Sequence, residues 1–234
     1  MKAALHIMVK ELEDYFVSPI AYIVIAVFLL VSGWLFFSTF FLFNQASLRN
    51  YFDLLPVSLA FVIPAMTMRL LAEERSRGSW ELLLTLPVTA RAVTAGKFLA
   101  ATFFAAAMIT PVLFYALCIS LIGDLDWAVV FTSYAGSILL AASYCAIGLL
   151  ASSLTRNQII AFILAMVLCF LIAVLDKMLF FMPRPLVEPL SYLAADTHFQ
   201  NIAKGVIDSR DLVYFGSLVW AALYAADLIL ETSE

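Results

Sequence analysis

A cluster of charged side chains stands out in a sequence that has few of them. Only 13% of the 234 residues are charged, yet five charged residues fall within positions 73–81: Glu73, Glu74, Arg75, Arg77 and Glu81. Trp80, Leu83 and Leu84 follow at the spacing that puts them on one face of a helix. Aromatic and leucine anchors surrounded by charges are typical of a surface that docks on another protein. The plainer alternative is a loop helix that packs its leucines against its own helical bundle.

ATP binding by this chain is not indicated by its sequence. The phosphate-binding motif G-x-x-x-x-G-K-[ST] is absent. Gly96 and Lys97 have the right ending, but Arg91 stands where the first glycine is required and Phe98 follows the lysine. If ATP drives this protein, a separate chain must bind it. The chain itself is expected to carry no cofactor.

The overall composition is that of a membrane protein, with 65% hydrophobic residues. Six stretches are long and apolar enough to cross a bilayer as helices: 20–43, 52–71, 98–122, 127–154, 159–182 and 212–230. Pro56, Pro64 and Pro111 lie inside the second and third stretches and are expected to kink them. The net charge of −4 and the lack of a basic tract argue against a nucleic-acid partner.

The distribution of basic residues predicts that both termini lie in the cytoplasm. This orientation places eight basic residues inside, namely Lys2, Lys10, Arg69, Arg75, Arg77, Arg91, Lys97 and Arg156, and five outside. The short loop at 123–126 has no basic residue, as expected of an outside loop under the positive-inside rule.

An amphipathic helix is predicted at residues 1–17, lying on the cytoplasmic membrane surface. Leu5, Met8 and Leu12 recur at helical spacing, and charged residues occupy the rest of the helix. Ser18 and Pro19 then end it before the first span. Residues 18–234 form the six-helix transmembrane domain.

A short rigid helix is predicted at residues 79–86, inside the cytoplasmic loop 73–96. Gly78 interrupts the preceding helix, and Ser79 is a favourable N-cap with Glu81 in the first turn. Pro87 ends the helix, and Thr89 is expected to cap the helix of the third span.

Outside, the only large element is the segment 183–211, which begins rich in proline and continues with a helical pattern. Asp196 is expected to be the N-cap of a short helix, and Gly205 to end it. Asp208 is expected to cap the start of the last span.

Little in the sequence indicates enzymatic or metal chemistry. His6 and His198 lie on opposite sides of the membrane in the predicted topology, so they form no pair, and His198 is interpreted as a loop residue. Cys118, Cys145 and Cys169 lie in apolar runs without metal-ligand spacing and are interpreted as small buried hydrophobic residues.

Two other functional classes stay open. An ion-coupled transporter usually places ionisable residues deep in the bilayer, whereas Asp53, Arg69, Lys97, Asp176, Lys177 and Asp227 all lie toward the ends of the predicted spans. Asp227 is the deepest of them. A membrane anchor that recruits a complex without transporting anything would also carry a docking helix.

Three segments together resemble the ABC-2-type transporter permeases. "EERSRGSWELLLTLPVTARAVTAGKFLA" at 73–100 is similar to the loop between the second and third spans of that family. "KELEDYFVSPIAYIVIAVFLL" at 10–30 resembles the start of the gliding-motility-type branch of the family. "HFQNIAKGVIDSRDLVYF" at 198–215 resembles the last external segment of that branch. The resemblance extends over nearly the whole chain and keeps the order of the segments.

The resemblance implies a permease subunit that exports its cargo with a separate ABC ATPase, on which Mg-ATP is bound. Helix 79–86 would be the coupling helix, and the ATPase-facing surface would comprise Glu73, Glu74, Arg75, Arg77, Ser79, Trp80, Glu81, Leu83, Leu84 and Pro87. Trp80 stands where many family members carry a smaller polar residue. A second permease half, identical or related, and membrane lipid would be the other partners, in a bacterial inner membrane. The segment 183–211 would close the pathway on the outer side.

Overall fold

The computed structural model describes residues 2–43, 48–78, 89–121, 123–179, 182–183, 187 and 190–232. Regular structure in this part of the chain is helical, in the order α1 (Lys2–Val17), α2 (Pro19–Phe43), α3 (Arg49–Thr67), α4 (Ala72–Arg77), α6 (Ala90–Ile109), α7 (Val112–Ser120), α8 (Trp127–Leu154), α9 (Gln158–Leu179), α11 (Ala195–Ala203) and α12 (Ser209–Glu231). The predicted all-α fold is confirmed.

Within the described residues, six helical segments are long and apolar enough to span a membrane: Pro19–Ser38, Arg49–Arg77, Ala90–Ser120, Trp127–Leu154, Gln158–Leu179 and Ser209–Glu231. Each overlaps one stretch predicted from the sequence. The second joins α3 and α4 through a turn, and the third joins α6 and α7. The protein is therefore a multi-pass membrane protein.

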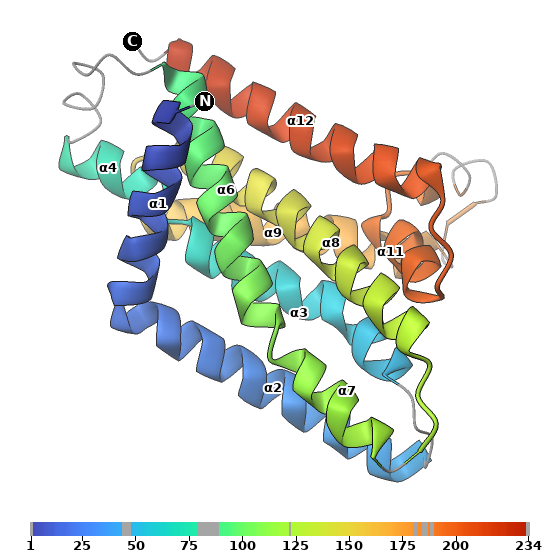
Figure 1. Ribbon diagram of the computed structural model, residues 1–234. Helices are drawn as coiled ribbons and strands as arrows, with labels where there is room; N and C mark the ends of the chain where they lie inside the picture. The colour runs from blue at the N-terminus through green and yellow to red at the C-terminus, as the bar shows by residue number, and fades with distance from the viewer. Residues whose placement is uncertain are drawn as a thin grey trace.

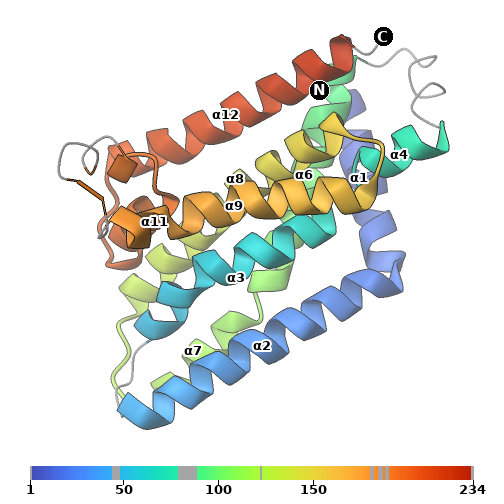
Figure 2. The same cartoon turned by 180° about the vertical axis from the view of Figure 1, so that it is seen from behind.

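Both termini lie at one end of the bundle, where α1 runs across the ends of the long helices (Figure 1). We call this the terminal end. Helix α11 lies at the opposite end, called the far end here, and the reverse view shows the same separation (Figure 2). An even number of crossings requires the two termini to share a side.

Helix α8 is the centre of the bundle, because it contacts α3, α6, α9, α11 and α12. Small residues allow these close approaches. A Cβ atom added at Gly148 would overlap the Thr67 hydroxyl on α3, and one at Gly136 would lie 2.8 Å from Ile202 on α11. In contrast, α2 packs mainly on α3 and keeps most of its apolar surface exposed, as expected of a lipid-facing helix.

The third span is broken at Pro111, as the sequence predicted. Helix α6 ends at Ile109 and α7 begins at Val112, because proline has no N–H to donate and its ring opposes a continuous helix. The two parts contact different neighbours. Helix α6 packs on α1 and α8, whereas Tyr115 of α7 stacks on Phe36 of α2 at 5.9 Å between ring centroids. Pro56 and Pro64 lie within α3.

Local end signals of four helices agree with the sequence. Gly78 follows α4 with a φ of 72°, and Gly205 follows α11 with a φ of 87°, both in the left-handed region that glycine favours. The Thr89 side chain accepts from the backbone N–H of Ala92 at the start of α6. Asp208 caps α12 by accepting from the N–H of Arg210.

The predicted N-cap of α11 is wrong. Ala194, not Asp196, holds the N-cap position. Asp196 lies in the first turn and is buried, with its carboxylate 3.2 Å from the Lys177 ammonium on α9. Pairing with a distant lysine, rather than local capping, determines its position.

Candidate functional site

The predicted ATPase-facing surface is described only at its base. Glu73, Glu74, Arg75 and Arg77 form most of α4, which follows the turn after α3 at the terminal end. Ser79, Trp80, Glu81, Leu83, Leu84 and Pro87 lie outside the described residues. The site therefore begins with the contacts that hold α4.

Ser152 of α8 fixes the turn that leads into α4. Its buried hydroxyl oxygen accepts from the backbone N–H groups of Leu71 at 3.0 Å and Ala72 at 2.9 Å. The same hydroxyl donates to the carbonyl of Met68 at 3.0 Å. One side chain thus satisfies three backbone groups that the interrupted helix leaves without helical partners.

A second contact between α4 and α8 comes from Arg75. Its guanidinium donates to the backbone carbonyl of Ser153, next to Ser152 in α8. Arg77 is mostly exposed and pairs with Glu73 one turn earlier in α4, at 2.6 Å. Arg75 therefore attaches α4 to the bundle, whereas the Arg77 pair stays within the helix.

Lys97 of α6 is the centre of the site. Its side chain is only 2% exposed, and its ammonium nitrogen lies 2.6 Å from a carboxylate oxygen of Glu11 and 2.8 Å from one of Glu74. A buried ammonium is costly unless it is paired and hydrogen-bonded. Because Glu11 belongs to α1 and Glu74 to α4, the three charges join α1, α4 and the third span.

Tight backbone packing brings α1 to this position. A Cβ atom at Gly96 would lie 2.8 Å from the carbonyl oxygen of Ala4 and 2.9 Å from Ile7, so only glycine lets α6 approach α1 this closely. Lys97 follows Gly96 directly and faces Glu11. The glycine and the ion pair are parts of one contact.

Tyr15 attaches α1 to two spans at once. Its buried hydroxyl donates to the carbonyl of Met66 on α3 at 3.0 Å. Its ring stacks on Phe104 of α6, with centroids 4.7 Å apart. Burial raises the pKa of the Tyr15 phenol well above its ordinary value, so the group stays a neutral donor.

The apolar residues of α1 lie on two faces rather than one stripe. Ile7, Leu12 and Tyr15 pack against the bundle, whereas Leu5, which the sequence placed on one stripe with Leu12, is exposed, and so is Phe16. The exposed apolar side chains give this helix a surface that suits lipid, as expected of a helix lying on a membrane.

A polar cavity of about 300 Å³ lies between these elements. Its lining includes both carboxylates that pair with Lys97 and extends over α1, α3, α4 and α6; the residues are Glu11, Asp14, Tyr15, Ser18, Met66, Arg69, Leu70, Glu73, Glu74, Arg77 and Lys97. Movement of α4 relative to α1 changes this space directly.

Sequence reasoning did not find the Lys97 site. It treated Lys97 as a residue near a span end whose ammonium reaches toward water, but the ammonium is buried between two acids. The signal was present, since Lys97 is the eighth residue of α6 in an apolar context and follows a glycine. A lysine two turns inside a span requires a carboxylate partner.

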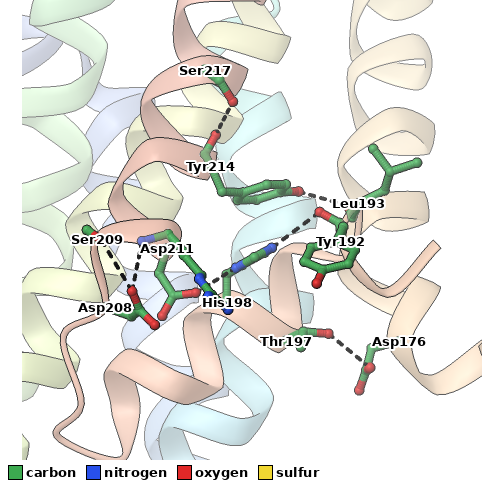
Figure 3. Close-up of polar contacts among 11 residues, drawn as sticks. Asp176, Tyr192, Leu193, Thr197, His198, Asp208, Ser209, Asp211, Tyr214 and Ser217 are labelled. Atoms are coloured by element: carbon green, nitrogen blue, oxygen red, sulfur yellow. Dashed lines mark hydrogen bonds and ion pairs between the residues drawn. The ribbon is translucent and has the colours of Figure 1, made fainter. Parts of the chain in front are cut away.

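A second polar cluster holds α11 at the far end. His198, interpreted from the sequence as a loop residue, is buried within α11, the short helix that the sequence also predicted here, and its Nδ1 atom lies 2.6 Å from the Asp211 carboxylate on α12 (Figure 3). Its Nε2 atom lies 3.2 Å from the Tyr192 carbonyl, and its ring stacks on Tyr214. Thr197 donates to Asp176 of α9 at 3.0 Å (Figure 3). These contacts attach α11 to α9 and α12.

The described side chains give no support to metal chemistry, since no group of three or more His, Cys, Asp or Glu residues among them is placed to hold an ion.

Asp227 lies one turn before the end of α12, close to the terminal end as predicted. Cys145 and Cys169 are buried and free, consistent with their interpretation as small buried hydrophobic residues, whereas Cys118 is free but only partly buried.

Comparison with known proteins identifies the family. A comparison with curated proteins gives no match. The family model described as "ABC-2 family transporter protein" matches residues 5–206, which include α1, the Lys97 site and α11. This match covers most of the chain and agrees with six apolar helices and a membrane transport role without catalysis of its own. The chain belongs to the ABC-2 family of transporter proteins.

Proposed function

We propose that the chain is one permease half of an ATP-driven exporter in a bacterial inner membrane, of the gliding-motility-type branch. Two such halves, identical or related, surround the transport path, and separate ABC ATPase subunits bind Mg-ATP. The terminal end faces the cytoplasm. Family membership, the lack of a phosphate-binding motif and the basic residues near the terminal end support this proposal.

In this proposal the ATPase contacts the predicted helix 79–86, and Trp80 and Leu84 bind in a groove of the partner. Four charged residues of α4 lie at the edge of that contact: Glu73, Glu74, Arg75 and Arg77. Movement of this loop reaches α4 first, because α4 directly precedes it in the chain. Arg75 and Ser152 then carry the movement to α8.

The main support for a coupling role is the buried Lys97 ammonium and its two ion pairs, with Glu11 and with Glu74. The single Lys97 ammonium contacts both Glu74 of α4, the helix that leads into the loop, and Glu11 of α1. An ion pair buried from water keeps its geometry better than an exposed one, because water and salt screen it less. Displacement of α4 therefore shifts α6 and α1 together and rotates the membrane half as a body.

The first test is co-purification from native membranes in mild detergent, comparing the wild type with Trp80→Ala/Leu84→Asp. An ATPase subunit is expected to accompany the wild type and to be lost from the variant, because the variant removes one anchor and buries a charge at the other. Absence of any ATPase from the wild-type preparation would contradict the proposal and favour an ion-coupled or anchoring role.

The second test separates docking from force transmission. Glu11→Gln keeps the Lys97–Glu74 pair but removes the charge that ties α1 to it. The ATPase is still expected to co-purify, whereas the ATP-dependent change in hydrogen exchange of residues 2–17 is expected to fall by at least half. Glu13→Gln, which alters an exposed acid of the same helix, is the matched control. Equal ATP responses in both variants would exclude this route.

Orientation is tested with introduced cysteines and a membrane-impermeant maleimide on intact cells, in a Cys118→Ser background in which the remaining Cys145 and Cys169 are buried. Asp124→Cys is expected to be labelled and Asn157→Cys to be protected until the membrane is opened. The opposite labelling pattern would place the terminal end outside and rule out an intracellular ATPase partner.

A further inference from the structure

A cavity of about 390 Å³ at the far end lies apart from the site described above. Its floor is apolar and well packed, since Leu48, Phe52 and Val130 are all nearly buried. These residues come from the start of α3 and the start of α8. An apolar floor with a few polar groups at the rim is the usual composition of a small-molecule site.

The rim of this cavity carries charges of both signs, and each sign comes from different elements. Arg49 at the start of α3 and Lys204 at the end of α11 supply the basic groups. Asp124 and Asp126 supply the acidic groups from the loop before α8. Asp126 already accepts from two backbone N–H groups as the N-cap of α8, which leaves Asp124 as the acid available to a ligand.

Lys204 and Asp124 are not paired with each other or with another side chain in the part of the chain that the structure describes. An unpaired base and an unpaired acid at the rim of one cavity complement a molecule that carries both an anion and a cation. A singly charged ligand would use only one of the two groups.

The position of the cavity indicates where such a molecule resides. Two membrane spans, Arg49–Arg77 and Trp127–Leu154, begin beside it. Trp127 follows Asp126 directly and is partly exposed, and tryptophan is enriched where the hydrocarbon core meets the headgroups. The charged rim and the apolar floor thus match the headgroup and the glycerol region of a lipid.

We propose that this cavity binds a zwitterionic phospholipid with a phosphoethanolamine headgroup. The phosphate lies between Arg49 and Lys204, the ammonium faces Asp124, and the first acyl carbons cover Phe52. This site does not depend on the ATP-driven role, because none of its residues belongs to the terminal-end site.

Native mass spectrometry of the full chain in micelles with equal amounts of palmitoyl-oleoyl phosphatidylethanolamine and phosphatidylglycerol tests the proposal. The phosphatidylglycerol headgroup keeps the phosphate but replaces the ammonium with hydroxyl groups. The wild type is expected to retain the ethanolamine lipid about fivefold over the glycerol lipid. Lys204→Gln/Asp124→Asn is expected to reduce that ratio to about one. Arg210→Gln, which removes another exposed far-end base, is expected to leave the ratio unchanged.

Each other outcome overturns the proposal. An equal wild-type ratio, or a ratio that survives Lys204→Gln/Asp124→Asn, would mean that this cavity does not select the headgroup. Free phosphoethanolamine, added to lipid-free micelles, is expected not to stay bound. If it stays bound as well as the lipid does, the ligand is a free zwitterion and the assignment to lipid is wrong.

Discussion

The Lys97 ammonium lies 2.8 Å from the Glu74 carboxylate, across 23 positions of sequence that include the predicted partner-binding helix. The two ends of the loop are therefore joined at their base by a buried ion pair. Glu11 closes the arrangement from the other side at 2.6 Å.

Lys97→Met is expected to lower the free energy of unfolding by about 3 kcal/mol, because it leaves two carboxylates partly buried without their cation. Equilibrium unfolding in mixed micelles measures the change. Lys10→Met removes an exposed lysine of α1 and is expected to have an effect within about 0.5 kcal/mol. If both variants lose the same stability, the buried pair has no special role.

Tyr15→Phe is expected to cost about 1 kcal/mol, since it removes the hydrogen bond to Met66 and keeps the stacking on Phe104. Tyr22→Phe, at an exposed tyrosine, is the control. The pH dependence has a definite sign. Burial raises the folded-state pKa of Tyr15 above the ordinary value of 10.0, so this stabilisation is complete below that pH and is lost as pH rises above it. Between pH 10 and 11 the wild type should lose more stability than Tyr15→Phe; equal slopes would contradict this.

Ser152→Ala is expected to loosen the turn that leads into α4, because two buried N–H groups lose their acceptor. We expect a loss of about 2 kcal/mol and faster hydrogen exchange at residues 68–78. Ser153→Ala is a close control, since the Ser153 hydroxyl donates only to Leu150 of its own helix. Exchange that rises equally in both variants would show that Ser152 does not hold this turn.

His198→Ala is expected to destabilise the far end by about 3 kcal/mol, because it leaves the Asp211 carboxylate buried without its partner. The double variant His198→Phe/Asp211→Leu is expected to recover most of that loss, since it removes both polar groups and refills the volume. Unfolding of His198→Phe, Asp211→Leu and the double variant, each compared with the wild type, gives the coupling energy. Additive losses in the double variant would mean that the pair is not coupled.

Local signals predicted much of the fold. Glycine at Gly78, the hydroxyl of Thr89, the carboxylate of Asp208 and the ring of Pro111 each act on backbone within a few positions, so their effects are visible in the sequence. The hydrophobic lengths of the spans are equally local. The number of spans and their approximate positions were therefore predictable from the sequence alone.

The candidate site was only partly predictable, because its contacts join distant positions. Glu11 and Lys97 are 86 positions apart, and Ser152 is 81 positions from Leu71. Nothing near Asp196 distinguishes a helix cap from a buried partner of Lys177. Only the three-dimensional packing of α1 and α8 decides which polar side chains meet.

The break at Pro111 divides the third span into two helices, α6 and α7, that are held by different neighbours. Helix α6 is attached to α1 through the ion pair of Lys97 with Glu11. Helix α7 is attached to α2 through Tyr115, whose hydroxyl donates to the Leu29 carbonyl at 3.2 Å. Because the two parts of the third span have separate attachments, the contact between α7 and α2 holds the second part of this span in place independently of the Lys97 ion pairs.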